Sequence, residues 1–187
     1  MSDAPRVNAV ELPVAGVWIA IPGHADLHFV VRHMGLSKVR GRFSRLQVAA
    51  TIDEDPARSS LEVIIDMTSV ETGEPSRDKH LQSADFFDVA SFPVATYRST
   101  GLRLSGQNAV VLGQLTIRDI TQPVNLDVTY LGHATDPAGK VRSLFSASTS
   151  VNREDWNLTW NRVLDSGGLL ISKEVKLEVE IELGTQQ

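Results

Sequence analysis

Ten residues near the carboxyl end alternate between charged and apolar side chains without interruption. The apolar residues stand at every second position, namely Val175, Leu177, Val179, Ile181 and Leu183. A period of two sends successive side chains to opposite faces of a β-strand, so residues 174–183 predict a strand with one dry face and one wet face. Such a strand has to bury its dry face, which favours an antiparallel sheet that covers a core on one side.

The same period recurs in weaker form along the chain. It is carried by Phe29, Val31 and His33, by Leu126, Val128 and Tyr130, and by Phe145, Ala147, Thr149 and Val151. We expect further strands over residues 14–21, 24–34, 41–53, 60–66, 96–104, 108–118, 122–135 and 140–152. Turns are expected at residues 54–56, Gly106, Asp119, Pro123 and residues 136–137. Short strands at nearly regular spacing indicate a sandwich or a barrel.

One segment breaks the strand pattern. Residues 77–83 are mostly polar and follow a loop over residues 68–75, and we expect a short helix there with Ser76 as its N-cap. Lys79 stands where a capping box would carry Glu or Gln, so that box is incomplete. A second candidate for a short helix covers residues 154–158.

Composition limits the classes of function that the chain can have. Its 187 residues suit one domain, which we place at residues 14–187 behind a flexible lead-in over residues 1–13. The formal net charge is −5, and the densest cationic group is only Arg40, Arg42 and Arg45, which argues against nucleic acid as a partner. The sequence contains no cysteine, which excludes disulfides and thiolate metal sites.

The sequence also gives an expectation about location. Residues 1–13 lack the apolar core of a signal peptide, and no run of residues is long and apolar enough for a transmembrane segment. As written, the sequence predicts a cytoplasmic protein. A leader removed from the natural chain would make it periplasmic or secreted instead.

Several groups of residues together form a sequence signature that extends along most of the chain. The first group reads Arg77-Asp78-x-His80-Leu81, then Phe86-Phe87-Asp88, then Phe92-Pro93 with Thr96-Tyr97 behind it. Others are residues 24–35 followed by Gly41-x-Phe43, residues 113–124, and Arg153 with Trp156. In this order, these groups resemble the signature of the YceI-like family. Asp119 and Asn157 stand where that family often has glycine, and both residue types tolerate turn or left-handed backbone geometry.

The resemblance implies an all-β fold, an eight-stranded antiparallel lipocalin-like barrel with one or two short helices. Members of the family hold polyisoprenoid or other long lipid chains in the barrel, and many of them are exported. The resemblance therefore implies that this chain binds a long-chain apolar lipid, as a carrier, storage or scavenging protein. A polyisoprenoid, an isoprenoid quinone and a fatty-acid-like chain are the candidates. A homodimer is expected on the same ground.

An eight-stranded barrel is either filled by its own side chains or holds one small ligand. The low aromatic content of 6%, and small residues at the presumed inward positions Gly113, Ala147 and Thr149, favour an apolar tunnel. We expect the tunnel to be lined by Phe29, Val31, His33, Val63, Ile65, Phe87, Phe92, Leu115, Leu126, Val128, Phe145, Leu177 and Val179. Each also has a purely structural interpretation, since an inward apolar residue of a barrel is core by default.

The Phe86-Phe87 pair follows the predicted helix directly. We expect one ring to plug or line the end of the barrel and the other to pack the helix against it. In the alternative interpretation both rings only hold the helix in place. Arg77 and Asp78 are expected to form a local ion pair or capping network rather than to contact a ligand.

Other functions were weighed against lipid binding. His24 and His28 share one face of a strand, but His33 lies on the opposite face, so the three cannot converge on a metal from one straight strand. No Gly-x-Ser-x-Gly elbow or other nucleophile motif is present, so we expect no enzyme activity and no cofactor besides a bound lipid. The alternative is a metal-binding or protein-interaction module with a filled barrel. Trp156 and Trp160 could then form a dimer patch, or else a tunnel lid or packing at the outer edge.

Overall fold

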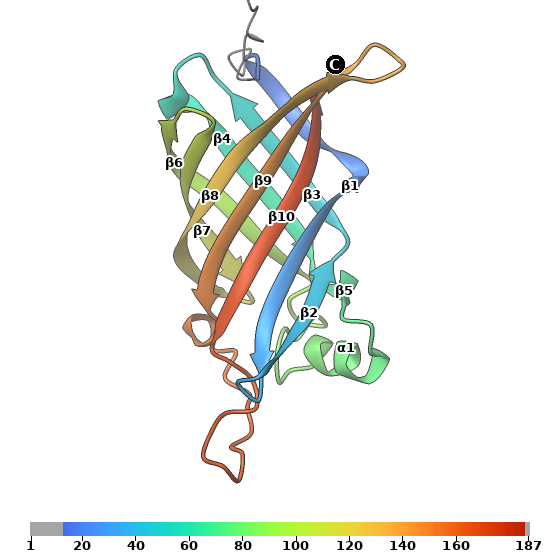
Figure 1. The fold of residues 1–187 in the computed structure, drawn as a ribbon, viewed down its shortest axis with the longest axis vertical. Helices are drawn as coiled ribbons and strands as arrows, with labels where there is room; N and C mark the ends of the chain where they lie inside the picture. Colours follow the sequence, from blue (N-terminus) through green and yellow to red (C-terminus); the bar gives the residue numbers. More distant parts are fainter. Residues whose placement is uncertain (1–12, 186–187) are drawn as a thin grey trace, which may run out of the picture.

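The computed structural model describes residues 13–185 and folds them into a closed antiparallel barrel (Figure 1). The strands are β1 (Gly16–His33), β2 (Ser37–Phe43), β3 (Leu46–Ile52), β4 (Ser60–Asp66), β5 (Val70–Glu71), β6 (Val94–Ser105), β7 (Asn108–Ile117), β8 (Ile120–Thr135), β9 (Val141–Asn152) and β10 (Glu174–Thr185). One α-helix, α1 (Pro75–Gln82), lies outside the barrel, and short 3₁₀ turns occur at Pro56–Arg58, Met67–Ser69 and Arg153–Trp156. The predicted lead-in over residues 1–13 falls outside the described residues, except for Pro13.

The barrel closes because β1 pairs with β10, the last strand of the chain. Their register runs from Trp18 opposite Thr185 to Val30 opposite Lys176. The remaining neighbours follow the order β10-β9-β8-β7-β6-β4-β3-β1, so eight strands form the wall. The expected eight-stranded antiparallel barrel with a short helix is therefore confirmed. Closure removes the unpaired edges that an open sheet would expose to other chains.

Strand β1 is longer than the sequence predicted. The two expected segments, residues 14–21 and 24–34, form one strand of 18 residues whose register shifts between Ala20 and Ala25. On its other side, β1 pairs first with β3 and then, from Leu27 to His33, with β2. β1 changes its partner because the strand pairing is interrupted at Ser44 and Arg45, which separate β2 from β3. The expected single strand over residues 41–53 is therefore wrong. The β1–β2 ribbon therefore extends past the lower end of the barrel in Figure 1.

Helix α1 begins two residues earlier than predicted, with a different N-cap. Pro75 occupies the first turn, where its missing N–H costs no hydrogen bond. The Glu74 carboxylate caps the helix by accepting from the backbone N–H groups of Ser76 and Arg77, at 3.1 and 2.7 Å. The prediction of Ser76 as N-cap is therefore wrong. Hydrogen bonds from the capping region, led by the Ser76 hydroxyl, hold the pKa of Glu74 below its ordinary value.

Two further expectations near the strand ends are corrected. Pro123 does not make a turn, because it lies within β8 opposite Gln114 of β7. Strand β9 begins to pair with β8 only at Asp127, so the missing N–H of Pro123 leaves no ladder bond unmade on that side. The helical candidate over residues 154–158 is the 3₁₀ turn Arg153–Trp156, and its C-cap residue Asn157 has the left-handed conformation with a φ of 56°.

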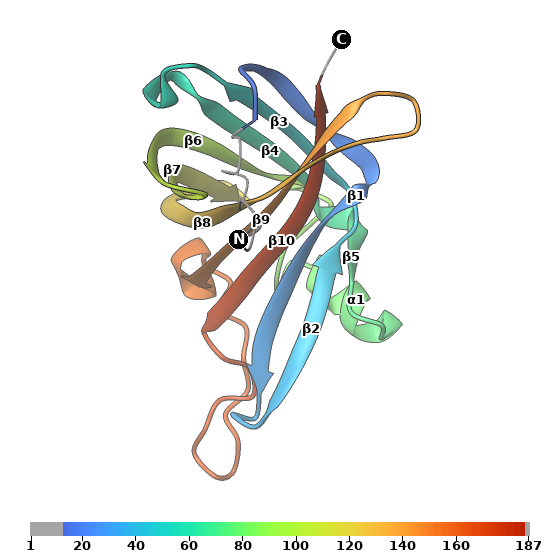
Figure 2. The same cartoon turned by 45° about the horizontal axis from the view of Figure 1, so that its top comes forward.

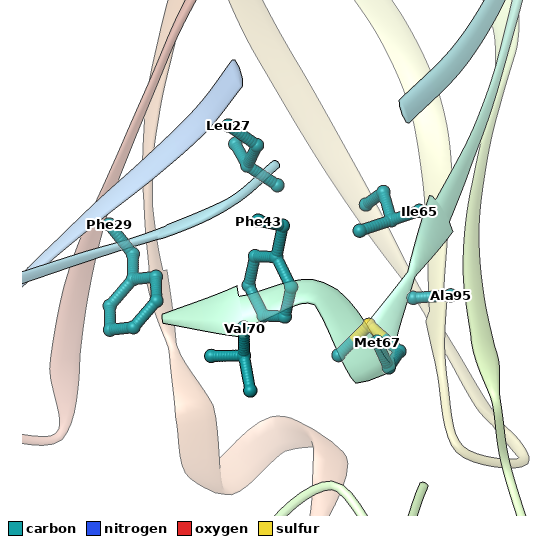
Figure 3. Packing of buried hydrophobic residues seen from close by; sticks show 7 residues of the cluster. All are labelled: Leu27, Phe29, Phe43, Ile65, Met67, Val70 and Ala95. Atoms are coloured by element: carbon teal, nitrogen blue, oxygen red, sulfur yellow. The ribbon is translucent and has the colours of Figure 1, made fainter. Parts of the chain in front are cut away.

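One of three clusters of buried side chains lies at the end of the barrel that carries α1. Figure 3 shows Phe43 and Met67 below Leu27 and Ile65, with Phe29 beside them. Leu81 of α1 and Phe87 pack against this cluster from outside it. Within residues 13–185, no helix is long and apolar enough to cross a bilayer.

Candidate functional site

An apolar cavity of about 590 Å³ occupies the barrel interior. It begins beside Leu27, Ile65 and Leu115 and extends toward the end of the barrel opposite α1. That end carries the β3–β4 connection and the β6–β7 turn, and Figure 2 tilts it toward the viewer. A volume of about 300–1,000 Å³ is usual for small-molecule sites. The filled barrel of the alternative interpretation is therefore wrong.

All eight strands of the barrel contribute to the wall, and on six of them the lining side chains follow a clear alternation. They include Leu46, Val48 and Ala50 of β3, Leu61, Val63 and Ile65 of β4, Val111 and Leu115 of β7, Val124, Leu126 and Val128 of β8, Phe145 and Ala147 of β9, and Leu177, Val179, Ile181 and Leu183 of β10. Each set keeps a period of two, so the dry face read from the sequence is the inner face of the barrel. A ligand in this space would contact almost only hydrocarbon.

The structure places eight of the thirteen predicted tunnel residues in this wall. They are Val63, Ile65, Leu115, Leu126, Val128, Phe145, Leu177 and Val179. Their contact with a ligand stays a prediction, but their position beside the cavity is a property of the fold. Ala147 and Thr149, two of the small inward positions, also line the cavity and leave space in it.

The other five predicted tunnel residues do not border the cavity. Phe29 is buried below it, in the cluster around Phe43. Val31 and His33 follow on the same strand and lie further along the β1–β2 ribbon, where they pair with Val39 and Ser37. Their placement in the tunnel was wrong because alternation assigns a side chain to a face of the sheet and says nothing of its depth along the barrel axis.

Phe87 and Phe92 were also misplaced, for two different reasons. Phe87 lies on the far side of Phe43, with ring centroids 5.5 Å apart, so it closes the cavity from below rather than lining it. Phe92 is only half-buried and lies under the guanidinium of Arg118, whose Cζ is 5.6 Å from the ring centroid. Neither ring is part of the wall.

Aromatic rings form the floor of the cavity. Phe43 stands between Phe29 and Phe87, with centroids 5.7 and 5.5 Å away, and all three pack below Leu27 and Ile65. Gly41 is required beside them, because a Cβ at that position would overlap the ring of Phe29. This accounts for the Gly41-x-Phe43 motif as the base of the cavity.

The two phenylalanines after α1 have separate positions. Phe87 packs against Phe43 in the floor of the cavity. Phe86 instead packs against His80 of α1 and Trp160, with ring centroids 5.1 and 5.4 Å away. His80 also lies 4.6 Å from Trp160, and its Nε2 is 2.8 Å from an Asp85 carboxylate oxygen. Phe86 therefore fastens the helix to the long connection between β9 and β10.

Trp156 is buried, so it offers no exposed dimer patch. Only 1% of its surface is exposed, and its indole Nε1 donates to the main-chain oxygen of Leu115 at 3.1 Å. Arg153, three residues earlier, donates to the carbonyl oxygens of Leu158, Trp160 and Ser172. Burial lowers the pKa of this guanidinium. This motif orders the β9–β10 connection.

Arg77 and Asp78 are engaged with the chain before the helix. The Asp78 carboxylate accepts from the N–H and hydroxyl of Thr72, at 2.8 and 2.5 Å. Arg77 donates to the hydroxyl and carbonyl of the same threonine, at 2.8 and 3.0 Å. Both side chains are used to anchor α1 beside β5, which agrees with the structural interpretation of the motif.

Gly113 does not leave open space in the cavity, because the ring of Tyr97 lies against it. Gly113 leaves a gap in β7, and the phenol ring of Tyr97 fills it, because a Cβ at Gly113 would overlap the ring. The hydroxyl lies 3.1 Å from the carbonyl oxygens of both Val111 and Val124. Burial raises the pKa of Tyr97 to about 12, so the phenol stays protonated as a donor.

The open end of the cavity, called the mouth below, is polar. It is lined by Pro13, Ala15, Thr51, Ile52, Asp53, Glu54, Pro56, Ser59 and Ser60, and by Gly106, Gln107 and Asn108. Asp53 accepts from the backbone N–H of Asp55 at 2.9 Å and from Arg58 at 3.1 Å. The Asp55 hydrogen bond, aided by the Arg58 charge, holds the pKa of Asp53 below its ordinary value. Asp53 is therefore ionised at neutral pH.

The histidines considered as metal ligands do not converge. His24 lies 2.9 Å from a Glu182 carboxylate oxygen, His80 contacts Asp85, and His133 accepts from or donates to the Tyr130 hydroxyl at 3.0 Å. Among residues 13–185, no group of three histidine or carboxylate side chains is close enough to hold a metal ion.

Several wall residues were missed although the sequence carried a signal for them. Leu61 continues the alternation of Val63 and Ile65, and Ile181 and Leu183 continue that of Leu177 and Val179. The mouth residues gave no such signal, because turns have no periodicity from which depth or direction can be read.

Comparison with known proteins agrees with this architecture. Residues 18–183 match the model of the YceI-like domain. Protein YceI of Salmonella arizonae is 37% identical over 165 residues, which cover 88% of this chain and 83% of that protein. The crystal structure of a Campylobacter jejuni YceI protein covers 83% of this chain and 90% of its own, with a TM-score of 0.71 and 26% identity.

A more distant structure shares the fold alone. It is a polyisoprenoid binding domain from Saccharophagus degradans, with a TM-score of 0.68 and 16% identity over 92% of this chain and all of that domain. The family match covers the entire barrel, from Trp18 in the first strand to Leu183 in the last. The chain belongs to the YceI-like domain family.

Proposed function

We propose that the protein binds one long-chain apolar lipid inside its barrel and acts as a carrier, storage or scavenging protein. The cavity of about 590 Å³, walled by hydrocarbon and open at one end, is the observation that carries this proposal. The barrel is also shared with a domain described as polyisoprenoid-binding. A polyisoprenoid, an isoprenoid quinone and a fatty-acid-like chain all have tails that suit such a wall.

The physical basis of binding is the removal of hydrocarbon from water. Each methylene buried contributes about 0.8 kcal/mol, before the losses of freedom that association imposes. Val63, Leu126 and Val179 come from three different strands and surround this space without a polar partner to satisfy. A long tail can therefore bind tightly without a strong polar contact, and the depth of the floor would limit its length.

Extraction of the purified protein with organic solvent, followed by mass spectrometry, tests the proposal. We expect about one lipid molecule per chain, or uptake of that amount when an isoprenoid quinone is added to delipidated protein. Native protein that releases no lipid and takes up no quinone would contradict the proposal. The same preparation, dialysed and submitted to elemental analysis, separates this function from metal binding.

A further inference from the structure

We infer that the closed end of the barrel docks on an anionic lipid bilayer through two neighbouring loops, which together are called the tip below. The tip consists of residues 32–40, around the β1–β2 turn, and of residues 161–173 in the β9–β10 connection. Figure 1 shows both segments extending beyond the lower end of the barrel, away from the mouth of the cavity. Docking at this end goes beyond the proposed function and does not depend on which molecule fills the cavity.

Backbone pairing joins the two loops of the tip into one unit. The β9–β10 connection folds back on itself through a β-bridge between Val163 and Leu169. Its returning stretch then pairs with the end of β1, where Ile171 forms a second bridge with His33. Because both loops are tied to β1, the side chains at their ends keep fixed positions relative to each other.

Apolar side chains lie at the outermost points of both loops. Leu36 is 85% exposed and Val163 is 76% exposed, the two largest fractions for large apolar side chains among the described residues. Met34 and Leu169 beside them are exposed as well, and none of the four lines the cavity. Single apolar residues are common on protein surfaces, but a group of them on adjoining loops indicates an interaction site. This group protrudes instead of forming a groove, which suits insertion into the outer layer of a bilayer.

The β1–β2 turn places Met34 where a small polar residue or glycine is usual. Met34 and Gly35 both have positive φ, 54° and 71°, and the N–H of Leu36 donates to the carbonyl oxygen of His33 at 3.1 Å. Tight hairpin turns favour Asn, Asp or Gly at such positions, because these residues tolerate the left-handed backbone. The methionine gives the turn no such advantage and holds a long apolar side chain outside the protein, so the geometry of the turn does not account for it.

The charge of the tip is opposite in sign to that of the chain. Residues 32–40 and 161–173 contain five Lys or Arg residues and a single acid, Asp165, whereas the formal net charge of the whole chain is −5. Of these cations, Lys173 forms an ion pair with Glu154, with nitrogen and oxygen 2.8 Å apart. The excess positive charge therefore lies beside the exposed apolar side chains.

The arrangement of these cations favours an external anion. Arg32 of β1 and Lys38 of β2 lie directly opposite each other, so they share one face of the ribbon. Like charges in that relation destabilise a strand pair. Among residues 13–185, no carboxylate forms an ion pair with either of them, nor with Arg162 in the other loop. An anionic surface in contact with the tip would offset this repulsion.

An anionic bilayer matches both features of the tip. Its acyl layer takes up exposed apolar side chains, and its phosphates attract the cations beside them. A second copy of this chain would bring a tip of the same charge against the first, which disfavours self-association at this end. Nucleic acid offers phosphate but no acyl layer for Leu36 and Val163.

Cosedimentation with vesicles tests the docking. The full chain is mixed at about 0.05 M salt, where screening is weak, with vesicles of phosphatidylcholine alone or with about 30% phosphatidylglycerol. We expect half-maximal binding to the anionic vesicles at a lipid concentration about tenfold or more lower than for the neutral ones. Binding should weaken severalfold at about 0.5 M salt. Equal binding to both kinds of vesicle, or binding to neither, would overturn the inference and leave the proposed function intact.

Apolar variants of the tip give the second readout. Leu36→Ser combined with Val163→Ser should weaken binding to the anionic vesicles about tenfold or more, because two apolar side chains no longer enter the bilayer. The matched control combines Leu131→Ser with Val141→Ser, which removes two exposed apolar residues from the β8–β9 hairpin at the opposite end of the barrel. The control should bind like the parent protein. Equal binding of the two double variants would contradict docking through the tip.

Charge variants separate an anionic surface from other partners. Arg32→Gln combined with Lys38→Gln should remove most of the preference for phosphatidylglycerol, since each cation near an anionic membrane strengthens binding by roughly fivefold. A preference that is unchanged in this variant would refute the role of the two cations. Analytical ultracentrifugation covers the remaining alternative. A parent dimer that Leu36→Ser with Val163→Ser dissociates would assign the tip to a second copy and overturn the inference.

Discussion

The ring of Tyr97 lies directly against the α-carbon of Gly113 on the neighbouring strand, which brings its hydroxyl within 3.1 Å of two main-chain carbonyl oxygens. Because Gly113 of β7 has no side chain, the Tyr97 ring of β6 fills the space that a side chain at this position would occupy. This contact seals one side of the cavity between Val111 and Leu115. Gly113, which was expected to leave the barrel interior open, therefore makes room for the buried hydroxyl of Tyr97.

Substitution Gly113→Ala should destabilise the barrel. The new Cβ would overlap the Tyr97 ring and lie 2.7 Å from the main-chain oxygen of Arg98, which cannot move without disturbing the β6–β7 ladder. We expect a loss of roughly 1–3 kcal/mol in the free energy of unfolding, measured by urea denaturation. Gly168→Ala is the control, because its nearest non-bonded atom would be 3.9 Å away. Equal stability of the two variants would refute this packing.

Ala147→Trp should block the cavity while the barrel stays folded. Ala147 lies between Val128 of β8 and Val179 of β10, and all three line the cavity. An indole at this position would occupy space that is otherwise open to a ligand. We expect extraction and mass spectrometry to show little bound lipid, with no decrease in the melting temperature. Ser146→Trp, on the opposite face of the same strand, should retain the lipid. Full lipid occupancy in Ala147→Trp would argue against the cavity as the binding site.

Leu177 and Phe29 show that the sequence predicts the face of the sheet on which a side chain lies but not its depth in the barrel. Both were placed on the inner face by alternation, and the pairing of β1 with β10 sets them directly opposite each other. Yet Leu177 borders the cavity and Phe29 lies beneath it. A period of two is a property of the backbone, so it predicts faces reliably. Depth depends on where the β1–β2 ribbon leaves the barrel, and no local pattern encodes that point.

The helix end illustrates a second limit. Ser76 is a common N-cap residue and was chosen on that preference, whereas the structure uses Glu74 because Pro75 occupies the first turn. Proline favours the first position of a helix, so the Glu74-Pro75 pair in the sequence is itself a signal for an N-cap at Glu74. The closure of β1 onto β10, in contrast, joins the two ends of the described chain, and it came from the family resemblance rather than from any single strand.

Phe87→Ala should open the floor of the cavity. Its ring contacts Phe43 and packs against two of the buried clusters, so removal leaves a void beside the aromatic floor. We expect a loss of about 3 kcal/mol in the free energy of unfolding. Phe92→Ala removes an equal ring that packs against none of the buried clusters and lies under Arg118, so it should cost roughly 1 kcal/mol. A larger loss in Phe92→Ala than in Phe87→Ala would show that the assignment of the floor is wrong.

Arg153→Lys should loosen the connection between β9 and β10. The guanidinium is 5% exposed and donates to three carbonyl oxygens of residues 158–172, a geometry that an ammonium group cannot reproduce. We expect a loss of roughly 1.5–3 kcal/mol in the free energy of unfolding and faster proteolysis within residues 157–173. The exposed Arg162→Lys should leave the cleavage rate unchanged. Identical proteolysis of Arg153→Lys and the parent protein would contradict this role.

Acid should weaken the fold in part through Asp66. Its carboxylate accepts from Arg45 Nε at 2.8 Å and from the N–H of Thr68 at 2.9 Å. The Arg45 hydrogen bond, followed by that of the Thr68 hydroxyl, holds the pKa of Asp66 below its ordinary 3.8. Because the folded protein binds this proton less tightly than the unfolded chain, the contribution is complete above that ordinary value and is lost as the pH falls through the lowered pKa.

Asp66→Asn should therefore lower the melting temperature at neutral pH and make its dependence on pH less steep below about pH 4. Differential scanning calorimetry from neutral pH to about pH 2 would measure both effects, and the curves of variant and parent should converge at the acid end. The dependence should persist in part, since hydrogen bonds lower the pKa values of Asp53 and Asp136 as well. Asp165→Asn, in the exposed β9–β10 connection, is the matched control. A constant difference in melting temperature between Asp66→Asn and the parent at every pH would mean that the ionisation of Asp66 does not stabilise this fold.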